Sequence, residues 1–146
     1  MPAGRPSSYS LHTAETICER LADGESLISI CADEGMPAKK TVLQWLSKHE
    51  EFRNQYAVAR ERQAEHYLDE ILEISDDGSR DYKKQADGRE APDYDHMARS
   101  RLRVDSRKWI MSKLAPKKYG DKLGISGDGD GSPLVVQIMK FSDKGD

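Results

Sequence analysis

Apolar residues recur at helical intervals along two long stretches in the second half of the chain. In residues 51–75 they follow the three-, four- and seven-residue steps of a single helical stripe. The members of this stripe are Ala57, Ala64, Leu68, Ile71 and Leu72. The spacing predicts a long amphipathic helix over this stretch.

A second long helix is predicted over residues 94–114, and it carries two apolar seams. Leu102 and Trp109 lie seven residues apart in one seam, and Val104 and Met111 lie seven apart in the other. Each arm therefore has more apolar surface than one small partner helix would cover. The two stretches predict a helical hairpin that associates further, and the alternative is a solvated two-helix core within one chain.

The pattern between residues 10 and 46 predicts three short helices. Ser10 and Ser26 are N-cap candidates, because a serine oxygen can accept a backbone N–H from the first turn. Gly35 suits the left-handed position at the end of the second helix, and Pro37 suits the first turn of the third. A short helix, a glycine-containing turn and a second helix with an apolar inner face predict a helix-turn-helix.

The third short helix has an apolar face formed by Val42, Trp45 and Leu46, and its opposite face is polar and basic. Lysine suits DNA phosphates or guanine edges, and glutamine can bond adenine. An arginine in the polar N-terminal arm could enter a minor groove. The predicted DNA-binding residues are Arg5, Lys39, Lys40, Gln44, Ser47 and Lys48. The alternatives are a solvated polar helix face and a disordered N-terminal arm.

Formal charge is distributed unevenly along the chain. Residues 1–50 hold five Lys/Arg and seven Asp/Glu, so a single copy should bind DNA weakly and many copies would have to act together. Residues 51–75 hold three Lys/Arg against six Asp/Glu, whereas residues 96–124 hold nine against two. An acidic helix beside a basic one can pair within a chain or between copies of the chain.

Basic residues recur every four positions along one edge of the second arm, at Arg99, Arg103 and Arg107. This edge can meet DNA phosphates, or it can meet the first arm of a neighbouring copy, where carboxylates recur at the same step. We favour the neighbouring copy and expect a closed cyclic homo-oligomer with head-to-tail interfaces. The predicted oligomerisation residues are Leu68, Ile71, Leu72, Arg99, Leu102, Arg103, Arg107 and Trp109.

Composition limits the function classes. The apolar content of 36% and the charged content of 34% favour several small helical units over one large core, and the net charge of −3 argues against general polyanion binding. Cys18 and Cys31 lack a CxxC pairing and are interpreted as small core residues in a reducing compartment. No signal peptide or membrane-length apolar run is apparent. No phosphate loop, HExxH motif or zinc spacing occurs, so we expect a cytoplasmic non-enzyme with no cofactor and no metal site.

The remaining segments are a charged connection over residues 76–93, interpreted as a mobile loop, and a Gly/Asp/Ser-rich linker before residues 134–141. The latter stretch is the only convincing β-strand, and we expect it to join equivalent strands in an intersubunit parallel barrel, or to dock as a tail on a partner. The predicted division is an N-terminal arm (1–9), a helix-turn-helix domain (10–50), a hairpin domain (51–122), a linker (123–133) and a C-terminal strand and tail (134–146). The predicted fold class is mainly α.

Two runs of residues carry a resemblance to a known family. The first begins at Gly4-Arg-Pro-Ser, continues through Gly35-Met-Pro and Trp45-Leu46, and ends with Gln63-Ala64. The second and more specific run joins Leu102-Arg-Val-Asp-Ser-Arg-Lys-Trp to Lys113-Leu-Ala-Pro-Lys-Lys-Tyr-Gly-Asp-Lys. Over about residues 4–122 the chain resembles the small terminase subunit of tailed bacteriophages.

The resemblance implies a DNA-recognition subunit of a genome-packaging motor. Such subunits form rings with outward-facing helix-turn-helix domains, and they deliver double-stranded viral DNA to a separate large subunit, an ATPase–nuclease whose activity they modulate. It implies action in the cytoplasm of the infected bacterial host, with no expected place in the mature virion. The alternative from the residues is a helix-turn-helix transcription regulator that binds DNA as a dimer.

Overall fold

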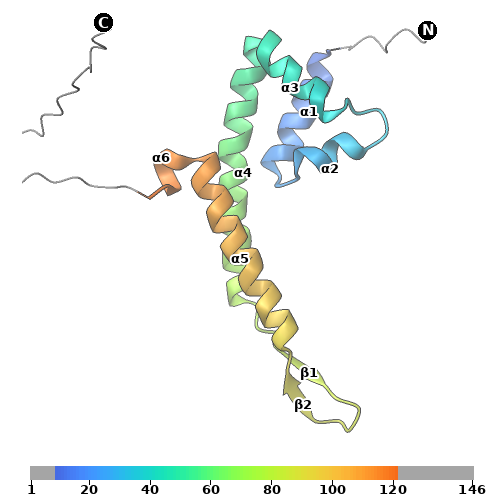
Figure 1. Cartoon of the computed structure of the whole chain (residues 1–146), viewed down its shortest axis with the longest axis vertical. Coiled ribbons are helices and arrows are strands. Elements are labelled where there is room, and N and C mark those ends of the chain that lie inside the picture. The colour runs from blue at the N-terminus through green and yellow to red at the C-terminus, as the bar shows by residue number, and fades with distance from the viewer. Residues whose placement is uncertain (1–8, 122–146) are drawn as a thin grey trace, which may run out of the picture.

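The computed structural model describes residues 9–121, and this part of the chain contains six helices and one two-stranded antiparallel sheet. The elements in chain order are α1 (Leu11–Ala22), α2 (Leu27–Ala32), α3 (Lys39–Lys48), α4 (Glu50–Asp76), β1 (Tyr82–Lys84), β2 (Glu90–Pro92), α5 (Tyr94–Leu114) and α6 (Pro116–Tyr119). Figure 1 shows α4 and α5 as a long hairpin, with α1–α3 gathered beside the first half of α4 and the β-ribbon at the opposite end. We call α1–α3 the N-terminal unit.

Local capping explains where the first helices begin and end. The Ser10 hydroxyl accepts the Thr13 N–H at 3.1 Å, and the Ser26 hydroxyl accepts the Ser29 N–H at 3.1 Å, which confirms both predicted N-caps. Gly24 follows α1 with a φ of 97°, a left-handed conformation that disfavours other residues. The two serine side chains therefore accept hydrogen bonds from backbone N–H groups that these short helices would otherwise leave without a partner.

The turn between α2 and α3 differs from its predicted form. Gly35 is left-handed, with a φ of 85°, but it lies two residues beyond the C-cap Asp33. Helix α3 begins at Lys39 after the extended N-cap Ala38, so the prediction that Pro37 occupies its first turn is wrong. A turn closed by the Met36 N–H and the Asp33 carbonyl, 3.2 Å apart, precedes the proline and lengthens the connection.

The N-terminal unit encloses the larger of two apolar clusters, and α4 contributes to it. Its buried members are Ala14, Ile17, Leu21, Leu27, Ile30, Val42, Trp45, Phe52 and Ala59. The two predicted small core residues, Cys18 and Cys31, are half-buried against this cluster and carry free thiols. Burial raises the pKa of the Cys18 thiol to about 11, so this thiol stays neutral at ordinary pH.

The smaller cluster joins α4, α5 and the residue that links α5 to α6. Ala64, Met111 and Ala115 are buried in it, and Ile71 packs against them. Val104 is half-buried, so the seam of Val104 and Met111 faces inward, whereas Leu102 and Trp109 are exposed. The two seams predicted for this arm thus lie on different faces, and the hairpin leaves one of them uncovered.

The connection between α4 and α5 was predicted as a mobile loop, but it contains a β-ribbon. Tyr82 pairs with Pro92 and Lys84 with Glu90, and the ribbon closes through a turn in which Gly88 has a φ of 80°. The prediction failed because the strands are three residues long and lack the apolar alternation that marks a half-buried strand. The expectation that residues 134–141 form the only convincing strand is therefore wrong as to 'only', because residues 82–84 and 90–92 are strands. Residues 134–141, the linker before them and Arg5 lie outside the described residues.

Candidate nucleic-acid interface

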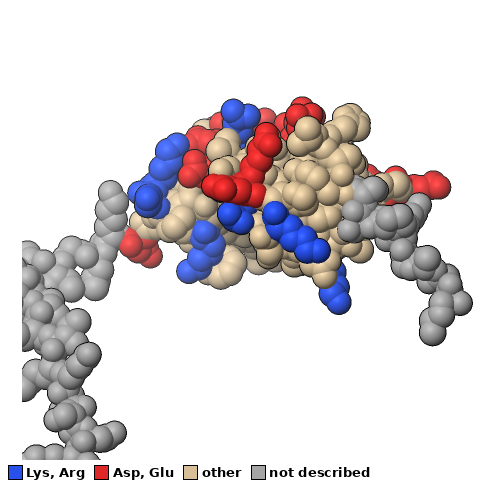
Figure 2. All heavy atoms as spheres, turned by 90° about the horizontal axis from the view of Figure 1, so that it is seen from above, with Lys and Arg blue, Asp and Glu red and all other residues tan. Residues whose placement is uncertain are grey.

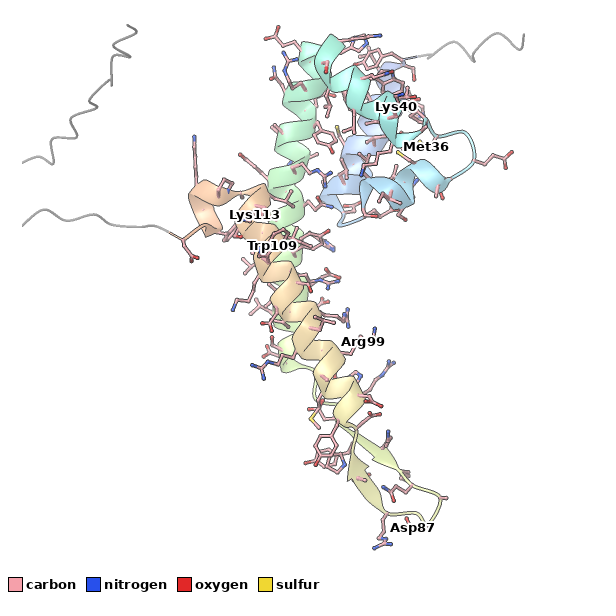
Figure 3. All side chains as sticks on the ribbon, viewed as in Figure 1. Met36, Lys40, Asp87, Arg99, Trp109 and Lys113 are labelled. Carbon is pink, nitrogen blue, oxygen red and sulfur yellow. The ribbon has the colours of Figure 1, made fainter. Side chains whose placement is uncertain are left out.

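The outward face of α3 presents the predicted polar residues together. Lys40, Gln44 and Ser47 occupy positions i, i+4 and i+7, all three are exposed, and Figure 3 places Lys40 on the outer surface of the N-terminal unit. Lys39 and Lys48 flank them and are also exposed. Among residues 9–121 no carboxylate lies within ion-pairing distance of any of these lysines. Their ammonium groups are therefore free to meet an external anion.

Aromatic packing beneath α3 fixes the direction of that face. The Trp45 ring meets Phe52 and Tyr9 edge to face, with centroids 6.1 and 5.2 Å apart. Tyr9 also stacks on His49, at 3.6 Å between centroids. Sequence reasoning identified Trp45 as a core residue but missed Tyr9, because a single aromatic residue before α1 has no periodic partner.

In addition to the apolar packing of Leu27 and Ile30, one arginine of α1 links both ends of α2. The Arg20 guanidinium donates to the Glu25 carboxylate at 2.8 Å and pairs with Asp33 at 2.6 Å. The hydrogen bond from Arg20 is also the main cause of the lowered pKa of Glu25. One side chain therefore connects the turn before α2 to the residue that ends it, and α3 follows from there.

A polar joint attaches the N-terminal unit to α4. Gln63 is 1% exposed; its Nε2 donates to the Glu25 carbonyl at 2.8 Å, and its Oε1 accepts from Arg60 at 2.7 Å. The Tyr67 hydroxyl donates to the Gly24 carbonyl at 3.3 Å. We call these contacts the Gln63 joint. They were not predicted, although Gln63 lies on the same helical stripe as the buried Ala59 and Phe52, a spacing that could have marked it as inward-facing.

Acidic and basic side chains are mixed around this end of the molecule. Figure 2, viewed from the end at which α4 begins, shows Lys and Arg interspersed with Asp and Glu and no continuous basic surface. This agrees with the excess of carboxylates in residues 1–50. The predicted DNA contacts are thus confined to a few positions, and five of the six lie on α3.

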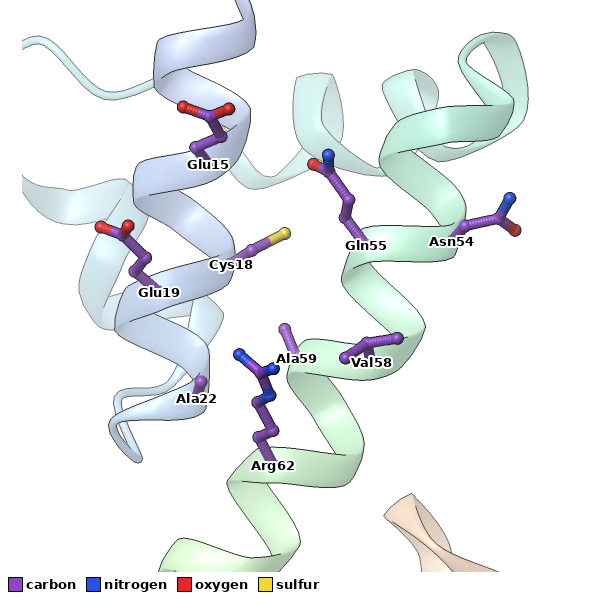
Figure 4. Close-up of a pocket in the computed structure, with 9 residues that line it drawn as sticks. All are labelled: Glu15, Cys18, Glu19, Ala22, Asn54, Gln55, Val58, Ala59 and Arg62. Atoms are coloured by element: carbon purple, nitrogen blue, oxygen red, sulfur yellow. The ribbon is translucent and has the colours of Figure 1, made fainter.

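A groove of about 390 Å³ lies between α1 and α4 (Figure 4). Cys18, Ala22, Val58 and Ala59 give it an apolar floor, and Glu15 stands on its rim.

Among the described residues no group of His, Cys, Asp or Glu is arranged to hold a metal ion. None of the helices in residues 9–121 is both long and apolar enough to cross a membrane.

The predicted oligomerisation residues separate into three groups. On the outer faces of α4 and α5, Leu68 (36%), Leu72 (54%), Leu102 (60%) and Trp109 (64%) are exposed. Arg99 and Arg103 are exposed on another edge of α5. Ile71 and Arg107, however, are engaged within the chain: Ile71 packs on Ala64, and Arg107 Nε donates to Glu70 at 2.6 Å. The four-residue step of the arginines and the three- and four-residue steps of the apolar stripe could not distinguish these inner contacts from outer ones.

Comparison with known proteins gives a consistent result. The family described as bacteriophage Sf6, terminase small subunit-like, matches residues 9–126. Crystal structures of three mutants of gp1, the terminase small subunit of the bacterial virus Sf6, each match with a TM-score of 0.66 and 40% sequence identity. Each match covers 94% of this chain and 97% of the other. A search of curated proteins gives no match.

Proposed function

The chain belongs to the bacteriophage Sf6 terminase small subunit-like family, and from this premise we propose that it selects DNA through α3 and assembles through the α4–α5 hairpin. It is a small terminase subunit of the Sf6 type, a non-catalytic component of DNA packaging, as the sequence resemblance implied. The family implies DNA and a large terminase subunit as partners. We expect it to act in the host cytoplasm, delivering DNA to the large subunit.

The exposed face of α3 is the observation that carries the proposed DNA contact. Lys40 is placed to meet phosphates or a guanine edge, and Gln44, one turn further on, has the bidentate amide that can read adenine. The buried Trp45 holds both residues outward. Because few cations are available per copy, useful affinity requires several copies bound to one DNA molecule. A dimeric transcription regulator, the alternative from the sequence, has no support in the comparisons.

The salt dependence of DNA binding tests this contact. Replacing Lys40 with alanine should reduce the slope of log affinity against log salt by about 0.9 for each engaged copy, since each phosphate contact releases condensed counterions. Lys84→Ala is the matched control, because it removes the same charge from the β-ribbon at the opposite end of the hairpin (Figure 1). Equal slopes for the two variants would remove α3 from the interface.

The uncovered outer faces of the hairpin carry the proposed assembly contacts. Trp109 and Leu102 project from α5, which holds six Lys/Arg and two Asp, and Lys113 Nζ lies 5.5 Å from the Trp109 ring centroid. Leu68 and Leu72 project from α4, which holds eight Asp/Glu and three Lys/Arg. Unlike faces that complement each other favour head-to-tail contacts, which close into a ring when the rotation permits.

Solution mass tests this assembly. Trp109→Ala removes a large exposed aromatic side chain from the proposed interface, so light scattering should find a smaller particle than the unmodified protein forms. Tyr82→Ala is the matched control, because Tyr82 is also a highly exposed aromatic residue but lies on the β-ribbon. An unchanged mass for Trp109→Ala, or an equal loss in the control, contradicts the proposed interface.

A further inference from the structure

We propose that Arg99 and Arg103 form a second contact with the DNA backbone, on the side of the hairpin that carries the N-terminal unit. The proposal extends the DNA recognition proposed for α3 and rests on it. The sequence favoured a role for these two arginines in contacts between copies. The proposal assigns them instead to contacts with double-stranded DNA.

The side on which the two arginines lie follows from the helical repeat. Gln63 and Glu70 lie seven residues apart on one face of α4, and the N-terminal unit covers Gln63. Arg107 binds Glu70, with Nε and Nη2 at 2.6 and 3.3 Å from the carboxylate oxygens. Arg103 and Arg99 precede Arg107 by one and two helical turns. The arginine edge of α5 therefore continues the face on which the N-terminal unit sits.

Two further observations support this placement. Figure 3 shows Arg99 projecting from α5 to the same side as the N-terminal unit with Lys40. The pKa of Glu70 lies below its ordinary value, chiefly through its hydrogen bonds to Arg107 and to a smaller extent through the charge of Arg103. The charge of Arg103 thus acts on Glu70, as expected if Arg103 lies on the same edge of α5 as Arg107.

The distance along the hairpin suits a DNA duplex. The α3–α4 junction lies at His49, so Glu70 is about 30 Å further along α4 at 1.5 Å per residue. Arg103 and Arg99 lie about 6 and 12 Å beyond that level. One turn of B-DNA spans about 34–36 Å. The length of hairpin between the α3–α4 junction and these arginines is thus of the order of one turn of B-DNA, so a duplex that runs along the hairpin from the N-terminal unit can also reach this edge.

The arginines are available for such a contact. Both are exposed, and among residues 9–121 no carboxylate forms an ion pair with either. Glu70, whose pKa the charge of Arg103 lowers, is already paired with Arg107. Asp95 lies one turn before Arg99 on α5 and is exposed. Two further carboxylates follow on this side, Glu73 on α4 and Asp77 at its C-cap. The proposed DNA contact therefore consists of two separate positive charges and not of a broad basic surface.

A neighbouring copy fits this edge less well than DNA does. The exposed apolar side chains of α5, Leu102 and Trp109, lie about 100° and 120° around the helix from Arg103, and Leu102 lies about 60° from Arg99. A stable interface between copies needs such apolar contacts at its centre. On α4, Glu61, Glu65 and Asp69 lie on the side turned away from Glu70, and Lys118 already binds Glu65 at 2.6 Å.

The test compares two edges of one helix in the full-length protein. The double variant Arg99→Gln with Arg103→Gln removes two charges from the proposed edge, and Arg101→Gln with Lys108→Gln removes two from the other edge of α5. Binding is measured against salt with random-sequence duplexes of about 60 base pairs and of about 10 base pairs, the latter roughly one helical turn. Light scattering gives the mass of each assembly.

We expect the first variant to lose about 1.8 units of log–log slope per engaged copy on the long duplex, which is about a 12-fold change in relative affinity between 50 and 200 mM salt. Its slope on the short duplex, its mass and the slopes of the control variant should not change. Equal slope losses for both edges, or a smaller mass with an unchanged slope, overturn the proposal, and the latter assigns the arginines to a neighbouring copy. If Lys40→Ala leaves binding unchanged while the arginine variant weakens it, the role proposed for α3 fails and the hairpin contact stands.

Discussion

Replacing Gln63 with alanine should loosen the N-terminal unit from the hairpin. Gln63 is 1% exposed and is the largest polar side chain fully buried in residues 9–121. Alanine removes the donor to the Glu25 carbonyl and the acceptor for Arg60, whose guanidinium keeps its bond to the Tyr56 hydroxyl at 2.6 Å. The carbonyl of Glu25 is then left without its partner in a closed joint.

The size of the effect follows from two contributions. A buried polar group left unsatisfied costs about 1–3 kcal/mol, and the space vacated by the truncated side chain adds about 1 kcal/mol or more. We therefore expect the free energy of unfolding of the N-terminal unit to fall by about 2–4 kcal/mol. Gln63→Met fills most of the volume without the hydrogen bonds, so it should show the first contribution alone.

Urea unfolding followed by tryptophan fluorescence provides the assay. Trp45 is buried in the N-terminal unit, and Trp109→Phe in every variant leaves Trp45 as the only tryptophan. Gln55→Ala is the matched control, because Gln55 lies on the same helix, is half-buried and makes no side-chain hydrogen bond within the described residues. If Gln63→Ala costs no more than Gln55→Ala, the joint does not stabilise the unit and the reasoning is wrong.

Three further predictions concern the hairpin and the turn after α1. Arg107→Glu should lower the free energy of unfolding by about 1–3 kcal/mol, because it separates a hydrogen-bonded charge pair, whereas the exposed Arg103→Glu should cost much less in the same urea titration. The depressed pKa of Glu70 adds stability that is complete above its ordinary pKa of 4.5 and is lost as pH falls below it; Arg107→Gln should flatten this part of the stability–pH curve. Gly24→Ala should cost at least about 2 kcal/mol through left-handed strain and overlap with a histidine ring of α4, whereas Gly35→Ala, with open space around it, should cost about 1 kcal/mol by thermal unfolding.

The helical framework was predictable because its signals are local. Serine caps, a glycine after α1 and apolar residues at steps of three and four act within a single element, and α5 begins and ends at the predicted residues. The break after that helix also has a local signal, because Pro116 cannot continue α5 and instead begins α6 as its first residue. The two seams of α5 were separable because residues seven apart share a face, and Leu102 and Val104 start seams on nearly opposite faces. That spacing did not say which of the two faces α4 covers.

The contacts between elements were not predictable by the same means. Gln63 is buried because α1 ends against it, and its hydrogen-bond partner lies 38 residues away. Arg107 looks like the two arginines before it, yet it alone reaches Glu70, because each step of four residues rotates the side chain further toward α4. The β-ribbon is held by backbone pairing and a tight turn, with strands too short to show a period in their side chains.

The proposed DNA contact lies on α3, and the proposed assembly contacts lie on the outer faces of the hairpin. This separation has a physical consequence. Each copy presents only a few free cations on α3. In the proposed assembly, binding strength therefore depends on the number of copies engaged, and the proposed contacts on the outer faces of α4 and α5 set their spacing. That spacing reaches the DNA only if the N-terminal unit is held firmly on α4. The Gln63 joint and the aromatic packing of Trp45 on Phe52 supply that rigidity at the two ends of the contact. A joint made of hydrogen bonds with fixed directions holds an angle more narrowly than apolar packing alone, so a polar Gln63 in an otherwise apolar contact is expected where the orientation of a binding face has to be kept.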